Sequence, residues 1–246
     1  MLSHRRLAQQ LKAHWRLRGI HYPIFRGEGP EVESLASLAA QMAPALDGVE
    51  GPIVLSGYSI GGLVAYEIAA LLRASGRKTV VVIMDSTSRQ MLFQRRRSLS
   101  VPHRILRRYR MAFHRIFVRW PRRFLYKRGW WRPKEGKFMP KEPHLRAFHD
   151  AGVTAVRDYF PPTTDVPVVI VRAVPPWQPD WLRRIYWPLR DGGWGLVAPV
   201  LDVVATPGNH LGIADPANAE VLAPHLDRAY RIAFAHLDAN DRSRSP

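Results

Sequence analysis

One short segment carries the residue types of a nucleophilic catalyst. Residues 56–62, SGYSIGG, fit the G-x-S-x-G pattern of a nucleophile elbow, in which a serine occupies a sharp turn between a strand and a helix. We expect the glycines at 57 and 61 to let that strand and helix approach without a Cβ clash. The N-terminus of the helix would aim free N–H groups at negative charge that develops on a substrate. The segment predicts that Ser59 is a nucleophile; the alternative is a glycine-rich turn without a catalytic role.

A serine hydroxyl becomes reactive when a histidine accepts its proton and a carboxylate orients that histidine. Asp85 follows the apolar run 79–84, and His210 follows the run 200–206 through a Pro-Gly-Asn turn. Ser59, Asp85 and His210 therefore occur in the chain order of α/β-hydrolase triads, each at the carboxyl end of an expected strand. Asp180, in the loop after the expected strand 166–173, is an alternative acid. Asp85 could instead have a structural role, as a helix cap or as a hydrogen-bond partner of Ser86 and Thr87.

Nine other histidines compete for the role of the base, and none of them follows a late strand. They lie in or beside a basic insertion (His103, His114, His144 and His149), on terminal helices (His4, His14, His225 and His236) or at the start of an early strand (His21). We therefore expect His210 to be the base.

The elements that would position these residues alternate along the chain. Apolar periodicity predicts helices over 4–15 and 33–46, a helix from the elbow to a C-cap at Gly76, and a last helix that Asp215 and Pro216 begin. Strands are predicted at 20–25, 52–55, 79–84, 166–173 and 200–206. Alternating strands and helices indicate an α/β fold with a mostly parallel sheet.

Composition narrows the class of protein. The 246 residues, 46% of them hydrophobic, suffice for one α/β core domain. The chain has no cysteine, which excludes disulfides and a cysteine nucleophile. We find no signal-peptide core, no stretch of membrane-spanning length, no metal-ligand cluster and no nucleotide-binding loop. The sequence thus predicts a cytoplasmic protein without a metal or a bound cofactor.

The positive charge is confined to one segment. The formal net charge is +17, but residues 89–146 hold 19 Lys or Arg against two acidic residues, and the rest of the chain has 18 of each sign. Apolar side chains at helical spacing in this segment predict an amphipathic helix. We therefore expect a core formed by residues 1–88 and 147–246, interrupted by a basic helical insertion at 89–146. Such an insertion suggests an acidic partner that docks at one face.

Four segments together resemble the thioesterase domains of nonribosomal peptide and polyketide synthases and the related stand-alone type II thioesterases. They are the elbow with its helix at 57–69, the run 82–86, the Gly-Trp-Gly at 193–195 and the turn at 207–210. The resemblance implies an α/β-hydrolase fold with helices on both faces of the sheet and a helical lid at 89–146. It also implies that Ser59 is the nucleophile, Asp85 the triad acid and His210 the base.

The resemblance further implies a substrate and a partner. The substrate would be an acyl thioester on the phosphopantetheine arm of an acidic carrier protein, and release could occur by hydrolysis or cyclisation. The N–H of Ile60 would be one oxyanion donor. Aromatic side chains of the lid could line an acyl channel, namely Phe113, Phe117, Trp120 and Trp130.

The start of the chain departs from the family pattern. Family members begin with a strand and a glycine-containing loop that supplies a second oxyanion donor, whereas this sequence opens at the following helix. The interpretations are a truncated start or impaired activity.

Three alternative functions stay open on the sequence. A general carboxylesterase would use the same triad. A carrier-binding module without catalysis would fit the absent loop. A nucleic-acid or membrane-surface helix at 102–134 would fit its interleaved arginines and aromatic residues, but the thioesterase interpretation is favoured over it.

Overall fold

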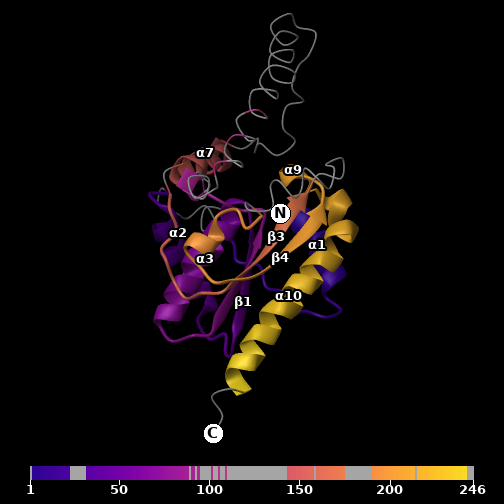
Figure 1. The fold of residues 1–246 in the computed structure, drawn as a ribbon. Coiled ribbons are helices and arrows are strands. Elements are labelled where there is room, and N and C mark those ends of the chain that lie inside the picture. Colours follow the sequence, from indigo (N-terminus) through magenta and orange to yellow (C-terminus); the bar gives the residue numbers. More distant parts are fainter. Residues whose placement is uncertain are drawn as a thin grey trace, which may run out of the picture.

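We describe a computed structural model of the chain (Figure 1). The structure describes residues 2–22, 32–88, 90–91, 93–94, 101, 105, 109, 143–157, 159–174, 190–213 and 215–242. Within these residues four parallel strands form one sheet in the order β1-β2-β3-β4. The strands are β1 (Ile53–Tyr58), β2 (Thr79–Met84), β3 (Val168–Val174) and β4 (Val200–Pro207). The predicted α/β class with a parallel sheet is confirmed.

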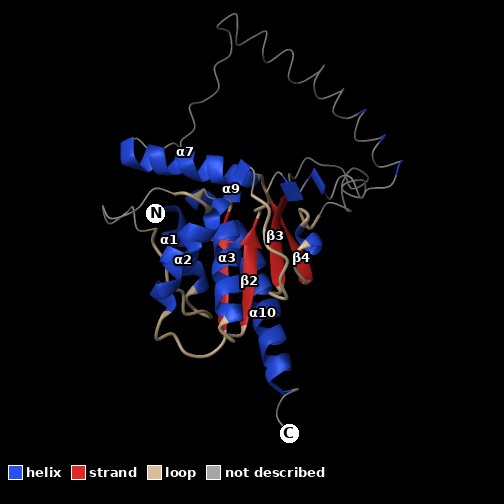
Figure 2. Ribbon diagram, turned by 90° about the vertical axis from the view of Figure 1, so that its left-hand side faces the viewer, coloured by secondary structure: helices blue, strands red, loops and turns tan. Residues whose placement is uncertain are grey.

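Helices cover both faces of the sheet (Figures 1 and 2). One face carries α2 (Leu35–Met42) and α3 (Ile60–Ala74), and the other carries α1 (Leu2–Leu11) and α10 (Ala219–Arg242). The helix α7 (Pro143–Arg157) lies across the top of α3 in Figure 2, and the short α9 (His210–Ile213) lies at the same end of the sheet. Single-turn 3-10 helices occupy Ala43–Leu46, Trp194–Leu196 and Pro216–Asn218.

The strand β2 shows why the sequence adopts this layering. Its six residues are all buried, with Val81 and Ile83 in the core on the α2 and α3 side and Val80, Val82 and Met84 in the core on the α1 and α10 side. An apolar strand of this kind is stable only where helices cover both faces of a sheet. Its polar successor, Asp85, is therefore delivered to the carboxyl edge of the sheet.

Several expected boundaries shift by a few residues. The first helix ends at Leu11 instead of residue 15, and the predicted helix 33–46 consists of α2, capped by Ser34, and a 3-10 turn that contains Pro44. The helix α3 ends at Ala74 with Ser75 as its C-cap, so the predicted cap Gly76, with φ of +85°, lies one residue beyond it. Asp215 caps the 3-10 turn directly before α10 instead of α10 itself.

The predicted strand at 20–25 is wrong for the part that is described. Residues 20–22 are not in the sheet; Ile20 and Tyr22 instead pack against the core beside α2 and α3. The Tyr22 ring lies 5.0 Å from the ring of Phe148 in α7. The alternating apolar side chains that suggested a strand are thus buried against helices instead of in a sheet.

The proposed domain boundaries stay predictions, because most of residues 89–146 lie outside the described part of the chain. The helix α7 begins at Pro143 and continues to Arg157, so it crosses the expected boundary at 146. Among the described residues, none of the helices has the length and apolar character needed to span a membrane.

Candidate active site

The sequence of the elbow places Ser59 in a strained turn. Ser59 directly follows β1 and directly precedes α3, and its backbone has φ of 55° and ψ of −123°, a conformation that non-glycine residues rarely adopt. Its N–H donates to the carbonyl of Met84 in the adjacent strand at 3.1 Å, and its carbonyl accepts from the Ser86 hydroxyl. Contacts from the neighbouring strand therefore hold the turn, and strain of this kind is typical of functional sites.

Two glycines, Gly57 and Gly62, allow the strand and the helix to come close, and only Gly57 is one of the pair that the sequence suggested. A Cβ at Gly57 would lie 2.1 Å from the carbonyl oxygen of Gly61, and a Cβ at Gly62 would lie 2.8 Å from the Cβ of Ser86. A Cβ at Gly61 would meet only the Tyr22 hydroxyl, at an ordinary 3.6 Å. The expectation is correct for Gly57 and wrong for Gly61, because Gly61 contributes its backbone oxygen to the close approach.

Asp85 and His210 reach Ser59 from the ends of two other strands. Asp85 follows β2, and its N–H donates to the carbonyl of Val171 at 2.8 Å. His210 begins α9 after β4, where Asn209 accepts a hydrogen bond from the N–H of Gly212 at 2.9 Å. The chain thus turns at the carboxyl end of each strand. These ends lie at the same edge of the parallel sheet, with β1 beside β2 and β4 separated from β2 by β3.

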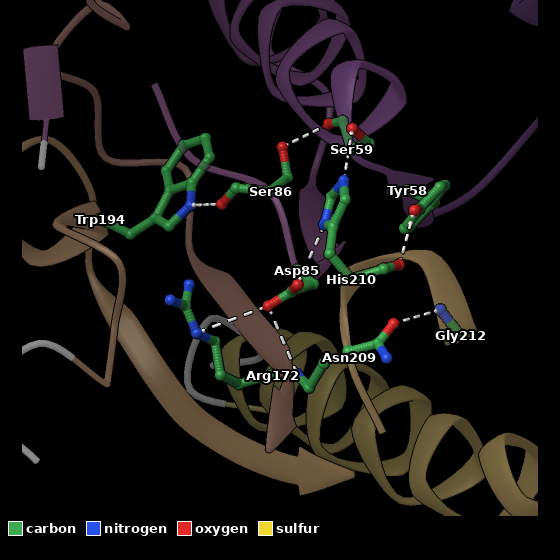
Figure 3. A network of polar contacts seen from close by, with 10 residues as sticks. Tyr58, Ser59, Asp85, Ser86, Arg172, Trp194, Asn209, His210 and Gly212 are labelled. Atoms are coloured by element: carbon green, nitrogen blue, oxygen red, sulfur yellow. Dashed lines mark hydrogen bonds and ion pairs between the residues drawn. The ribbon is translucent and has the colours of Figure 1, made fainter. Parts of the chain in front are cut away.

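The three side chains form one hydrogen-bonded chain (Figure 3). The Nε2 atom of His210 lies 3.1 Å from the Ser59 hydroxyl oxygen, and its Nδ1 atom lies 3.0 Å from Oδ2 of Asp85. The other carboxylate oxygen of Asp85 accepts from the N–H of Ala173 at 3.3 Å. The Asp85 side chain is 11% exposed and that of His210 is 46% exposed, so the carboxylate is sheltered and the imidazole faces solvent.

Tyr58 supports the histidine from the elbow itself, a role that sequence reasoning missed. Its hydroxyl donates to the backbone carbonyl of His210 at 2.6 Å, and the two rings lie 5.0 Å apart at 31°. Burial, and secondarily the negative charge of Asp85, raises the pKa of Tyr58 to about 12. The phenol therefore keeps its proton and stays a donor at physiological pH.

Trp194 and Arg172 also lie beside the three side chains. The indole N–H of buried Trp194 donates to the carbonyl of Ser86 at 2.8 Å, which explains the Gly-Trp-Gly segment in structural terms. The Nε atom of Arg172 lies 3.4 Å from Oδ1 of Asp85. A lone charged residue in the apolar run VVIVRAV of β3 is the signal that sequence reasoning could have used to find Arg172.

A pocket of about 230 Å³ opens beside these groups. It is lined by residues on α3, β3, α7 and α9 and in the turns after β1 and β2, namely Ser59, Ile60, Leu63, Asp85, Ser86, Thr87, Val156, Arg172 and His210. The helix α7 comes close to the serine, because a Cβ at Gly152 would lie 3.4 Å from the side chain of Ile60. The pocket is thus bounded by the elbow and by the helix that ends the predicted insertion.

The remaining predicted site residues fall outside the described part of the chain. These are the alternative acid Asp180 and the predicted lid residues Phe113, Phe117, Trp120 and Trp130. Among the described residues, no group of three or more His, Cys, Asp or Glu side chains could hold a metal ion.

A parallel sheet with helices on both faces and a strained serine between strand and helix defines the α/β-hydrolase class. The family model of the thioesterase domain matches residues 2–101, which include the elbow and Asp85. No protein with a curated description matches the chain in sequence.

Solved structures of thioesterase domains share the fold. The NocB thioesterase domain in covalent complex with a fluorophosphonate nocardicin G analog is 20% identical, with a TM-score of 0.58 over 93% of this chain and 88% of that one. The Vlm2 thioesterase domain bound with a dodecadepsipeptide is 21% identical, with a TM-score of 0.57 over 93% and 89%. The four-domain nonribosomal peptide synthetase AB3403 is 22% identical, with a TM-score of 0.56 over 94% of this chain and 18% of the synthetase.

The predicted resemblance to synthase thioesterase domains is therefore confirmed. The family model that matches is that of a thioesterase domain, and a thioesterase is the class of enzyme that the sequence predicted. Neither the family model nor the solved structures assign a role to an individual residue of this chain.

Proposed function

We propose that the protein is a thioesterase that releases acyl or peptidyl groups from a carrier protein in nonribosomal peptide or polyketide biosynthesis. Ser59 is the nucleophile, His210 the general base and Asp85 the acid that orients the imidazole. The observation that carries the proposal is the position of the His210 ring, whose two nitrogens lie 3.1 Å from the serine hydroxyl and 3.0 Å from the carboxylate. These are the contacts that activate a serine.

In the first half of the reaction, Oγ of Ser59 attacks the carbonyl carbon of the thioester while Nε2 of His210 takes the hydroxyl proton. Asp85 stabilises the imidazolium through Nδ1. The tetrahedral intermediate collapses with cleavage of the C–S bond, and the leaving sulfur receives the proton from Nε2. The product of this half is an acyl ester of Ser59.

In the second half, His210 removes a proton from the incoming nucleophile, whose oxygen or nitrogen attacks the ester carbonyl. Cleavage of the ester bond returns the proton from Nε2 to Oγ of Ser59. Water as the nucleophile gives a free acid, and a hydroxyl or amine of the acyl chain itself gives a ring. The exposed imidazole admits either nucleophile.

Negative charge on the carbonyl oxygen is stabilised by the N–H of Ile60. Ile60 is the first residue of α3, so its N–H has no acceptor within the helix, and the helix dipole favours an anion at this end.

The basic segment 89–146 is proposed as a lid and as the docking surface for an acidic carrier protein. Its charge of 19 basic against two acidic residues supports the docking, and the position of α7 above the elbow supports the lid. Phe113, Phe117, Trp120 and Trp130 are proposed to line the acyl channel. Carrier binding should weaken steeply as salt rises from 50 to about 300 mM because exposed charges are screened over roughly 10 Å; binding that does not change with salt would contradict a charge-driven contact.

The mass of the intact protein after reaction tests the proposal. A fluorophosphonate, or an acyl-pantetheine thioester, should add one phosphonyl or acyl group to the wild-type chain and none to Ser59→Ala. His210→Ala, which keeps the serine, should react more slowly than the wild type by a factor on the order of 10³ or more. A mass unchanged in a wild-type protein that is folded by circular dichroism would overturn the proposal and favour a carrier-binding module.

A comparison of matched substrates separates a thioesterase from a carboxylesterase. The acyl-pantetheine thioester and the corresponding oxygen ester differ in one atom, so the ratio of their kcat/KM values reports preference for the leaving group. A thioesterase should prefer the sulfur compound. Equal or higher kcat/KM for the oxygen ester would support the carboxylesterase interpretation instead.

A further inference from the structure

Arg172 is a permanent cation in the wall of the catalytic pocket. It lies near the carboxyl end of β3 and lines the same 230 Å³ pocket as Ser59 and His210. Among the described residues that line this pocket, the other groups that can carry a charge are Asp85 and His210. Its guanidinium gives the pocket a positive charge.

The surroundings of Arg172 leave space for its guanidinium. Gly192 has φ of +63°, and a Cβ at this position would lie 3.1 Å from Nη1 of Arg172 and 3.5 Å from Thr87. The Thr87 hydroxyl donates to the carbonyl of Gly192 at 2.6 Å and so holds this turn in place. The Arg172 side chain is 30% exposed, so it is sheltered but still reachable from the pocket.

The guanidinium uses only one of its edges in the protein. Its Nε atom faces Oδ1 of Asp85 at 3.4 Å, and in Figure 3 the two Nη atoms point away from that carboxylate. Within the part of the chain that the structure describes, no hydrogen bond from either Nη atom to a protein acceptor is found. The end-on pair of Nη atoms has the spacing to donate one hydrogen bond to each of the two oxygens of a carboxylate.

We propose that Arg172 binds a carboxylate on the acyl group, so that the pocket selects acyl thioesters with an acidic substituent. This proposal rests on the proposed function, because it places the acyl chain in the pocket beside Ser59. A carboxylate fits better than a neutral carbonyl because a charge-assisted bidentate contact is stronger than a neutral hydrogen bond. Asp85 does not fill this role, because its carboxylate meets Nε and not the Nη pair.

Matched acyl-pantetheine thioesters test the proposal. Glutaryl, adipoyl and pimeloyl thioesters vary the distance between carbonyl and carboxylate, and their ω-amides have nearly the same shape without the charge. Background hydrolysis is measured with Ser59→Ala. In the wild-type protein one chain length should give a kcat/KM at least tenfold above that of its amide, mainly through KM.

Substitutions of Arg172 should remove this preference. Arg172→Met should bring the acid-to-amide ratio of kcat/KM close to one, and Arg172→Lys, which keeps the charge without the paired donors, should give an intermediate ratio. The ratio separates recognition from positioning, because a disturbed Asp85 would slow both substrates equally. Arg73→Met, which removes an arginine paired with Asp165 at 2.6 Å outside the pocket, is the matched control and should leave the ratio unchanged.

An acid-to-amide ratio of kcat/KM near one in the wild type, or the same ratio in the wild type and Arg172→Met, would overturn the proposal. Hydrolysis of the amides would still leave the proposed function intact. If the wild-type protein hydrolyses neither substrate, the proposed function fails. The role of Arg172 is then tested by calorimetry, which measures the binding of the acid and of its amide. Ser59→Ala should then bind the best acid at least tenfold more tightly than its amide, and the double variant with Arg172→Met should not. Equal binding of the two compounds would overturn the proposal in that case as well.

Discussion

The glycines at 57 and 61 should respond in opposite ways to one added methyl group. A Cβ at Gly57 would lie 2.1 Å from the backbone oxygen and 2.3 Å from the backbone carbon of Gly61, so strand β1 and helix α3 would have to separate by about 0.9 Å to reach a tolerable 3.0 Å. Neither atom belongs to a side chain that could rotate away. A Cβ at Gly61 meets only a tyrosine hydroxyl, at 3.6 Å.

Gly57→Ala should therefore lower the free energy of unfolding by about 3 kcal/mol, the upper part of the usual range for overpacking. The enforced shift acts on the turn that carries Ser59, whose hydroxyl lies 3.1 Å from His210. Because a misplacement of about 1 Å can cost on the order of 10²-fold in rate, labelling by a fluorophosphonate should slow by about that factor. Gly61→Ala is the control: it replaces a helical glycine, so stability should rise by up to about 1 kcal/mol and labelling should change less than about threefold.

Urea unfolding of the two variants gives the stabilities, and the time course of intact mass gives the labelling rates. Equal stability and equal labelling of Gly57→Ala and the wild type would refute the reasoning, because the close approach of strand and helix would then not be needed. A loss in Gly61→Ala as large as that in Gly57→Ala would refute the assignment of the contact to Gly57.

Three further substitutions test the surroundings of the site. Tyr58→Phe keeps the ring but loses the 2.6 Å bond to the His210 carbonyl, so the rate of acyl-serine formation should fall about three- to tenfold at unchanged KM, as a bond of about 1 kcal/mol implies; an unchanged rate would contradict this role. Trp194→Phe removes the N–H that donates to the buried carbonyl of Ser86, so the free energy of unfolding measured in urea should fall by about 1–3 kcal/mol. A loss below about 0.5 kcal/mol, the usual effect of a surface substitution, would contradict this role of Trp194. Burial, together with the bond to Glu67 and its charge, raises the pKa of Tyr159 above its ordinary value of 10.0, so the folded protein keeps this proton after the unfolded chain has lost it and stability should fall as pH rises above 10. Tyr159→Phe should lower stability at pH 7, because Glu67 loses its buried partner, and should make the decline above pH 10 shallower; an equally steep decline would contradict the assignment.

The sequence by itself determined the order and type of the elements that matter for the site. An apolar run followed by glycine, serine and glycine, and then by helical periodicity, leaves few alternatives to an elbow, because each local signal agrees with the next. The same holds for Asp85, since a polar residue directly after a buried strand must emerge at the carboxyl edge of the sheet. His210 reaches this edge because only Gly208 and Asn209 separate it from the end of β4. These local rules were enough to select three residues that are 26 to 151 positions apart and that the structure brings into contact.

Only the tertiary structure decided which glycine is under steric pressure, which groups support the histidine, and where Arg172 points. Gly57 and Gly61 look equivalent in the motif, and their difference arises because one faces the backbone of the helix and the other faces a tyrosine hydroxyl. The same limit applies to the expected strand at 20–25. An alternation of apolar side chains predicts that they are buried but does not specify the surface that buries them, and the described residues of this segment pack against helices. Contacts of this kind join segments far apart in the chain, so their geometry depends on packing that no local pattern encodes.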